Sequence, residues 1–90
     1  MSADSPVPRL GVGTKLRFDS VRNAWVVLGP ERLFVPDEHA VEVLKLVDGT
    51  RSVAAIAALL AERFAAPADV IEADILPMLT DLAARGAVRL

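Results

Sequence analysis

The sequence contains no cysteine and no tyrosine, and its single histidine is His39. Without cysteine, neither a disulfide framework nor a thiolate metal site can form. A zinc site needs four protein ligands, or three and a water molecule, and one histidine cannot supply that set. A catalytic base or nucleophile also needs a partner that orients it, and no residue pairs convincingly with His39. These absences argue against an enzyme and predict that the chain holds no metal and no cofactor.

Long apolar runs are absent as well. The first thirteen residues, MSADSPVPRLGVG, lack the apolar core of a signal peptide. No segment approaches the roughly 18–20 continuous apolar residues of a membrane span. We therefore expect a soluble, cytoplasmic protein with no membrane contact. A chain of 90 residues is expected to form one small domain, which buries only about 60% of the surface that the unfolded chain exposes.

Basic residues are scarce in the second part of the chain. Residues 36–90 contain five basic and nine acidic side chains, a balance of −4, whereas residues 1–35 have a balance of +2. Residues 67–86 contain four acidic residues against Arg85 alone, a balance of −3. A helix that reads DNA needs Lys and Arg to contact the phosphates. We therefore expect no nucleic-acid partner.

Short apolar segments predict three strands in the first part of the chain. KLRFD (15–19) alternates, and AWVVLG (24–29) is apolar on both faces, as expected of a middle strand. RLFV (32–35) is a short third strand that ends at Pro36, because proline has no N–H for the ladder. The three segments predict an antiparallel meander in which the third strand lies at an edge.

From Asp37 on, the apolar period becomes helical. Asp37 and Ser52 are suitable N-caps for two helices, and Pro67 is tolerated at the start of a third. Gly49 and Gly86 are suited to end the first and the third helix. The residues at helical spacing that predict the core are Ala40, Val43, Leu44, Val47, Val53, Ile56, Ala57, Leu60, Phe64, Ile71, Ile75, Met78, Leu79 and Leu82.

These elements predict an α+β fold in which a three-stranded antiparallel β-meander packs on three α-helices, in an arrangement like a winged helix–turn–helix. Residues 1–13 are rich in Pro, Gly and Ser and are expected to form a flexible or loosely docked N-terminal arm. Residues 14–90 are expected to form the domain.

The third helix has two unusual features. Pro77 lies deep inside it and removes the N–H bond to the carbonyl of Ala73, which either bends the helix or divides it in two. Leu76 and Ala83 lie beyond the core stripe on one flank and widen the apolar arc. Such an arc is expected of a well-covered helix or of a helix whose flank lines a groove.

The short third strand is a candidate binding edge. An exposed edge strand presents unpaired N–H and C=O groups, which an extended peptide can pair with as a further strand. RLFV has this apolar character, and the flank of the third helix could receive the side chains of such a peptide. The alternatives are that the N-terminal arm or a second copy of the chain, in a homodimer, covers the edge.

Several short motifs follow one another in a specific order. They are Pro30-Glu31-Arg32, Leu46-Val47-Asp48-Gly49, Ser52-Val53, and Asp74-Ile75 followed by Leu79, Leu82 and Gly86. In this order and spacing, residues 9–88 resemble the pyrroloquinoline quinone (PQQ) biosynthesis protein D family (PqqD).

The resemblance implies a strand hairpin with three helices and a role without catalysis. Proteins of this family bind the small precursor peptide PqqA and present it to the radical SAM enzyme PqqE, which cross-links a Glu and a Tyr of that peptide. In related recognition elements, the leader peptide docks as an added strand between the third strand and the third helix. Carried onto this chain, the peptide-binding residues would be Arg32, Leu33, Phe34, Val35, Glu72, Leu76, Leu79 and Ala83. The alternatives are a recognition element for another ribosomally made, modified peptide, and a structural or dimerisation domain.

Overall fold

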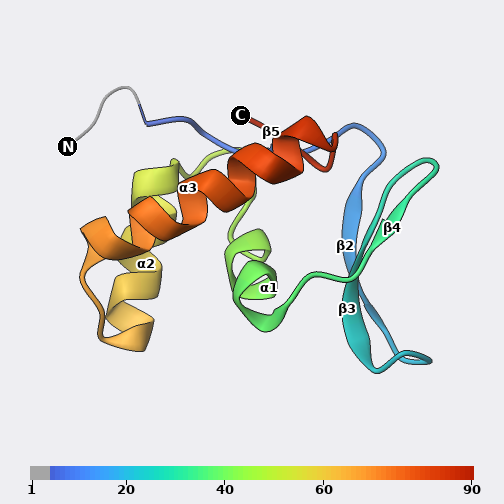
Figure 1. Cartoon of the computed structure of the whole chain (residues 1–90), viewed down its shortest axis with the longest axis horizontal. Coiled ribbons are helices and arrows are strands. Elements are labelled where there is room, and N and C mark those ends of the chain that lie inside the picture. The colour runs from blue at the N-terminus through green and yellow to red at the C-terminus, as the bar shows by residue number, and fades with distance from the viewer. Residues whose placement is uncertain (1–4) are drawn as a thin grey trace.

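The fold combines two small antiparallel sheets with three helices, in a computed structural model that describes residues 5–90. In Figure 1 the larger sheet stands at one end of the molecule and α2 lies at the other, α1 lies between them, and α3 runs from beside α2 toward the sheet. The α+β prediction is thus confirmed, while the winged helix–turn–helix detail stays a prediction. In chain order the elements are β1 (Arg9–Leu10), β2 (Lys15–Asp19), β3 (Ala24–Leu28), β4 (Leu33–Phe34), α1 (Glu38–Leu44), α2 (Val53–Phe64), α3 (Ala68–Ala84) and β5 (Val88–Arg89).

The larger sheet has the predicted meander order β2-β3-β4, with both pairs antiparallel. Val26 and Val27 of β3 are neighbours in sequence and both are buried, as expected of a middle strand with two covered faces. Phe18 of β2 lies opposite Trp25 of β3, and their rings meet edge to face with centroids 5.7 Å apart. β4 pairs only with β3 and forms one edge of the sheet.

The second sheet, which the sequence analysis did not predict, joins the two ends of the described chain. β1 pairs antiparallel with β5, with Leu10 opposite Val88. Next to this pair, the N–H of Gly11 donates to the carbonyl of Ala87 at 2.9 Å. A Cβ atom at Gly11 would lie 2.3 Å from the carbonyl oxygen of Gly86, so only glycine allows this close approach.

The N-terminal arm is hydrogen-bonded to the helical part from Ser5 on. The carbonyl of Pro6 accepts from the N–H of Val53 at 2.8 Å, and the carbonyl of Pro8 accepts from the N–H of Gly49 at 3.2 Å. The described part of the arm is therefore docked on the helical part, and its flexibility stays a prediction. Residues 1–4 lie outside the described residues, and the domain boundary after residue 13 stays a prediction.

The first two helices begin at the predicted caps. The Asp37 carboxylate accepts from the N–H of Ala40 at 2.8 Å, and the Ser52 hydroxyl accepts from the N–H of Ala55 at 3.0 Å. α1 ends at Leu44, earlier than the stop predicted at Gly49, because the next turns tighten into i to i−3 hydrogen bonds.

The core is one cluster shared by the helices and both sheets, and it contains nearly all of the predicted core residues. Ala40 is buried but outside the cluster. Phe64 is not buried, since 54% of its surface is exposed. It is the last residue of α2, and the chain then turns away through Ala65 in the left-handed conformation, so no later turn covers its ring. The buried members are Val27, Val43, Leu44, Val47, Val53, Ile56, Ala57, Leu60, Ile75, Leu79, Ala87 and Val88.

α3 continues through Pro77 as a single helix, which excludes the predicted alternative of two helices. Pro77 and Ala73 are both exposed, so water can hydrate the Ala73 carbonyl that loses its intrahelical donor. One turn later, the Thr80 hydroxyl donates to the carbonyl of Leu76 at 2.8 Å. The proline is tolerated because it lies on the face of α3 that looks away from the core.

Candidate functional site

The free edge of β4 follows from its register with β3. The N–H of Gly29 donates to the carbonyl of Arg32 at 2.9 Å, and Leu28 lies opposite Leu33. Hydrogen-bonded and non-bonded pairs alternate along an antiparallel ladder. Leu33 is therefore at a non-bonded position, with its N–H and C=O directed away from β3. Val35 is the residue after β4, and one further step of the same alternation would direct its N–H and C=O to the free edge.

The edge of β4 is apolar, in contrast to the other edge of the sheet. Leu33 and Val35 are 43% and 57% exposed, respectively. β2, at the opposite edge, carries the charged residues Lys15, Arg17 and Asp19. Charged side chains protect an edge strand against pairing with another chain. β4 is accordingly the edge better suited to accept a further strand.

Arg32 links the β3–β4 turn to the end of α3. Its Nη1 donates to the carbonyl of Arg85, the C-cap residue of α3, at 2.9 Å. A cation is favourable there because a helix C-terminus carries partial negative charge. A hollow of about 460 Å³, called here the turn hollow, lies at this junction and is lined by Pro30, Glu31, Arg32, Phe34, Arg85 and Gly86, among others.

The α3 residues that the sequence places in the site lie on one flank of the helix. Leu79 is completely buried in the core, and its assignment to the peptide groove stays a prediction. Glu72 and Ala83 are half-buried, and Leu76 is 38% exposed. At about 3.6 residues per turn, this flank is opposite the one that carries Asp74 and Arg85. None of the four predicted α3 residues lines the turn hollow or either of the two hollows described next.

Two further hollows flank Phe64, and sequence reasoning did not find them. The helical hollow, about 330 Å³, lies among the three helices and is lined by His39, Glu42, Leu60, Phe64, Ile71 and Asp74, with other residues. The aromatic hollow, about 590 Å³, lies between α1 and the sheet and is lined by Phe18, Trp25, His39, Glu42, Lys45 and Phe64, with others. The sequence signal was Phe64 itself, an aromatic residue at the end of a helical stripe.

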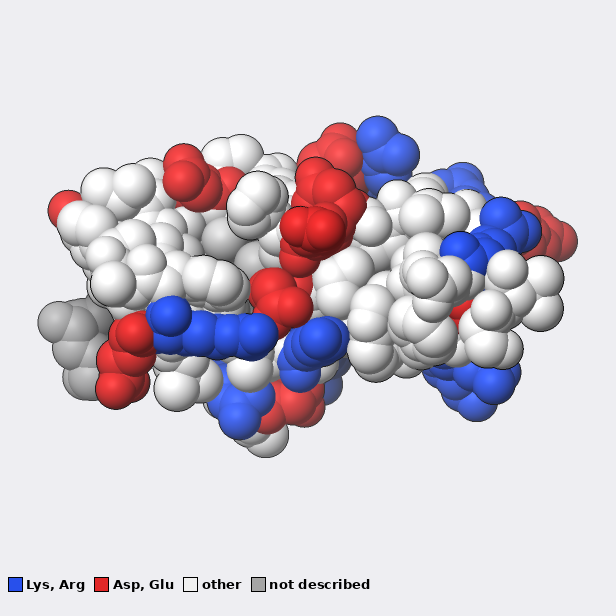
Figure 2. All heavy atoms as spheres, turned by 90° about the horizontal axis from the view of Figure 1, so that it is seen from below, with Lys and Arg blue, Asp and Glu red and all other residues white. Residues whose placement is uncertain are grey.

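Acidic side chains gather between the two halves of the molecule. Figure 2 shows Asp and Glu atoms in a band across the middle of this face, between the helices and the sheet. Glu42 is paired with Lys45 at 3.4 Å and with Arg63. The Lys45 ammonium also lies 4.9 Å from the centroid of the Trp25 ring. Neither Glu38 nor Asp74 has an ion-pair partner among residues 5–90.

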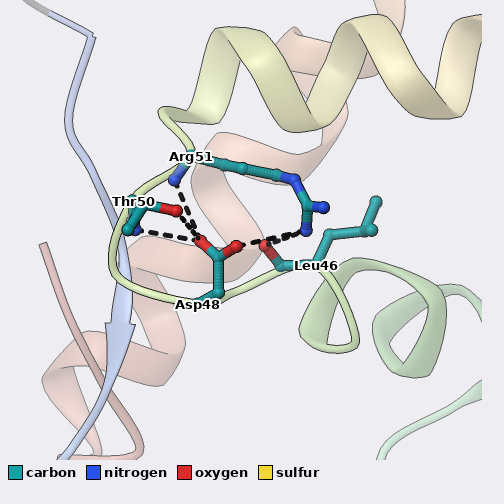
Figure 3. Close-up of polar contacts among 4 residues, drawn as sticks. All are labelled: Leu46, Asp48, Thr50 and Arg51. Atoms are coloured by element: carbon teal, nitrogen blue, oxygen red, sulfur yellow. Dashed lines mark hydrogen bonds and ion pairs between the residues drawn. The ribbon is translucent and has the colours of Figure 1, made fainter.

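Asp48 is the carboxylate with a strongly shifted pKa, and its role is structural (Figure 3). Its Oδ1 accepts hydrogen bonds from the backbone N–H groups of Arg51 and Thr50 and from the Thr50 hydroxyl, each at 2.9 Å. These bonds, together with the Arg51 guanidinium 3.3 Å away, lower the pKa of Asp48 from 3.8 to about 2. The carboxylate fixes the loop between α1 and α2.

Within the described range, no helix combines the length and the apolar composition that crossing a bilayer requires. No three His, Cys, Asp or Glu side chains of residues 5–90 are grouped so that they could hold a metal ion.

The comparisons with known proteins agree on one family. The family "Coenzyme PQQ synthesis protein D (PqqD)" matches residues 24–88. A PqqA binding protein of Rhodopseudomonas palustris is 52% identical over 79 residues, which are 88% of this chain and 78% of the relative. The bifunctional coenzyme PQQ synthesis protein C/D of Methylorubrum extorquens is 57% identical over 79 residues, but this chain spans only 21% of its length.

A solved structure extends the similarity to the fold. The solution NMR structure of the PqqD truncation of Methylobacterium extorquens PqqCD superposes with a TM-score of 0.82, at 50% sequence identity, over all of this chain and 96% of that one. That truncation is a functional, stand-alone recognition element for ribosomally synthesized and post-translationally modified peptides (RiPPs).

Proposed function

This chain belongs to the PqqD family, and we propose from this premise that it binds the precursor peptide PqqA in PQQ biosynthesis, without catalysing a reaction itself. Two relatives support the assignment, namely the PqqA binding protein of R. palustris and the RiPP recognition element of M. extorquens. The chain also lacks cysteine and tyrosine and has one histidine, so few side chains are available for nucleophilic or acid–base catalysis.

The binding mode that we propose is the addition of a peptide strand to the free edge of β4. The N–H and C=O groups of Leu33 and Val35 would pair with the backbone of PqqA, because the β3–β4 register directs them away from β3. Arg32 and Phe34 would lie beside the peptide, since both line the turn hollow at the end of β4. The observation that carries this mode is the position of β4 at an uncharged edge of the sheet.

Two flanks of α3 are candidates for contact with the peptide. The sequence assigns it to Glu72, Leu76 and Ala83, around the buried Leu79. The hollows are instead lined by the opposite flank, which carries Asp74 and Arg85. We place the peptide on the latter flank, because concave surface is found there next to α1 and the β3–β4 turn.

Presentation to a partner enzyme completes the proposal. Strand addition would order a flexible peptide and fix its register, and the complex would then dock on the radical SAM enzyme PqqE. A pull-down of PqqE with the protein, with and without PqqA, tests this step. Failure of the protein to recover PqqE in the presence of PqqA would contradict it.

An NMR titration of ¹⁵N-labelled protein with full-length PqqA tests peptide binding. We expect shift changes at the amides of residues 32–35 and on one flank of α3. If no amide shifts at a large excess of PqqA, the proposed function is wrong for this peptide. A panel of other precursor peptides then tests the alternative of a recognition element in another pathway.

The free edge also leaves the homodimer as an alternative use of β4. Sedimentation of the protein alone over a range of concentrations separates the two. A monomer at all concentrations agrees with an edge that is open to the peptide. A dimer that dissociates when PqqA is added would mean that a second copy covers the edge first.

A further inference from the structure

The helical hollow has the size and lining of a site for a large apolar side chain. Its volume is about 330 Å³, within the range typical of small-ligand pockets. Val43, Leu60, Ile71 and Ile75 form apolar walls. Phe64 borders the hollow with 54% of its surface exposed, although a phenyl ring gains free energy when it is buried. Phe64 and the half-buried Ala66 and Ile71 therefore remain available for contact with a second apolar group.

The rim of this hollow is acidic. Glu42 already pairs with Lys45 and Arg63, whereas Asp74 has no ion-pair partner in the described chain. The neighbouring aromatic hollow is bordered by Glu38, also without an ion pair among those residues, and by Lys45 and Arg63, which pair with Glu42. The band of Asp and Glu atoms in Figure 2 crosses the same face, between the helices and the sheet. This charge favours an occupant with a positive side chain next to its apolar one.

The hollow lies a short way along the chain from the free edge of β4. Val35 is followed by Pro36 and the cap Asp37, and His39 already lines the hollow. Four residues of extended chain span at most about 14 Å. Val35 and His39 are therefore at most about 14 Å apart, a distance that a peptide strand advancing about 3.3 Å per residue covers in at most about four residues.

We propose that the helical hollow receives an apolar side chain of the bound precursor peptide, one that has a Lys or Arg as a neighbour and lies within about four residues of the segment paired with β4. This inference rests on the proposed function. It gives the peptide two separate points of recognition. The edge of β4 hydrogen-bonds the peptide backbone and fixes the direction of the added strand. The hollow selects a large apolar side chain with an adjacent positive charge.

Methyl NMR on the unaltered protein tests the proposal without any substitution. The protein is labelled at the methyl groups of Ile, Leu and Val and titrated with full-length PqqA. We expect Ile71, Ile75 and Leu60 to shift together with the amides of residues 32–35. If the amides of β4 shift and these methyl groups do not, the hollow is not a peptide site, although peptide binding stands. If neither group responds, the proposed function fails as well.

A filled hollow gives the second test. Ala66 lines the hollow, and Ala66→Phe places a ring in it, whereas Ala58→Phe adds the same ring to the exposed side of α2 as a control. We expect Ala66→Phe to raise the Kd for PqqA at least about tenfold, as when one large apolar anchor is excluded. The control should stay within about twofold. Equal Kd values for the two folded variants would overturn the proposal.

The charge of the rim is tested with Asp74→Asn and the matched control Glu62→Gln. Glu62 is exposed on α2 and lines none of the three hollows. The loss of an exposed ion pair weakens binding by about two- to fivefold. Added salt screens such a pair and weakens binding in a similar way. We expect Asp74→Asn to raise the Kd by this factor and to reduce its dependence on salt. Identical salt dependence in both variants would show that the rim does not contact a basic residue.

Discussion

Replacing Leu33 with proline removes one N–H from the free edge of β4 and leaves the β3–β4 ladder intact. The register places Leu33 at a non-bonded position opposite Leu28, so its N–H does not pair with β3. Phe34, in contrast, is at a bonded position opposite Val27, and proline there would break the sheet. Leu33→Pro therefore separates the proposed peptide contact from the stability of the hairpin.

The expected size of the effect follows from the single hydrogen bond lost. A net contribution of about 0.5–1.5 kcal/mol corresponds to an increase in Kd of about 2- to 13-fold. The proline ring also occupies the space into which the added strand must approach, so the upper end of this range is expected. Val35→Pro removes the next outward N–H and should act similarly. Leu33→Ala retains the N–H and serves as the matched control for the side chain.

The assay is calorimetric titration of each variant with full-length PqqA. The fluorescence of Trp25, which contacts Phe18 across β2 and β3, reports whether the sheet is folded. We expect weaker binding in both proline variants than in Leu33→Ala. Binding by folded Leu33→Pro and Val35→Pro with the affinity of the unaltered protein would refute strand addition at β4.

Four further substitutions test the loop between α1 and α2, the third helix and the β3–β4 turn. Asp48→Asn should lower the free energy of unfolding at neutral pH. Because the folded pKa of Asp48 lies below 3.8, this difference should disappear as the pH falls from 3.8 to about 2, which urea unfolding at several pH values measures. Leu79→Ala should lower the free energy of unfolding by about 2–5 kcal/mol, since Leu79 is completely buried. Leu76→Ala should change the Kd for PqqA by less than about twofold. A large loss of affinity in folded Leu76→Ala would instead favour the α3 flank with Glu72, Leu76 and Ala83 as the peptide site. Arg32→Met removes the exposed hydrogen bond to the Arg85 carbonyl and should lower the free energy of unfolding by less than about 1 kcal/mol in urea, with faster amide hydrogen exchange in the β3–β4 turn.

The local elements could be predicted because each carries its signal within a few residues. Asp37 and Ser52 are caps whose side-chain oxygens accept from N–H groups three residues later, and such a contact depends only on nearby sequence. The β1–β5 pair could not be predicted in this way. It consists of two residues on each side, and its partners are almost the whole chain apart in sequence. Only the docking of the arm on Gly49 and Val53 brings them together.

The α3 side of the site shows a different limit. Helical periodicity correctly places Ile75 and Leu79 in the core, because the stripe depends only on spacing along the helix. Periodicity does not say which neighbour lies beside each flank of that stripe. Leu76 was chosen for its apolar character, but concave surface occurs where Asp74 lies beside α1. The choice between the flanks depends on the packing of α1 against α3, which is a tertiary property.

The shortness of the β4 edge explains why side-chain anchors are needed. Leu33 and Val35 offer two N–H and two C=O groups, and four hydrogen bonds contribute at most about 6 kcal/mol net. The loss of translational and rotational freedom on association costs about 4–15 kcal/mol. The backbone pairing alone therefore gives weak binding, which also protects the open edge from pairing with unrelated chains. An apolar side chain in the helical hollow adds the missing free energy, and it adds it only for a peptide whose anchor has the right spacing from the paired strand.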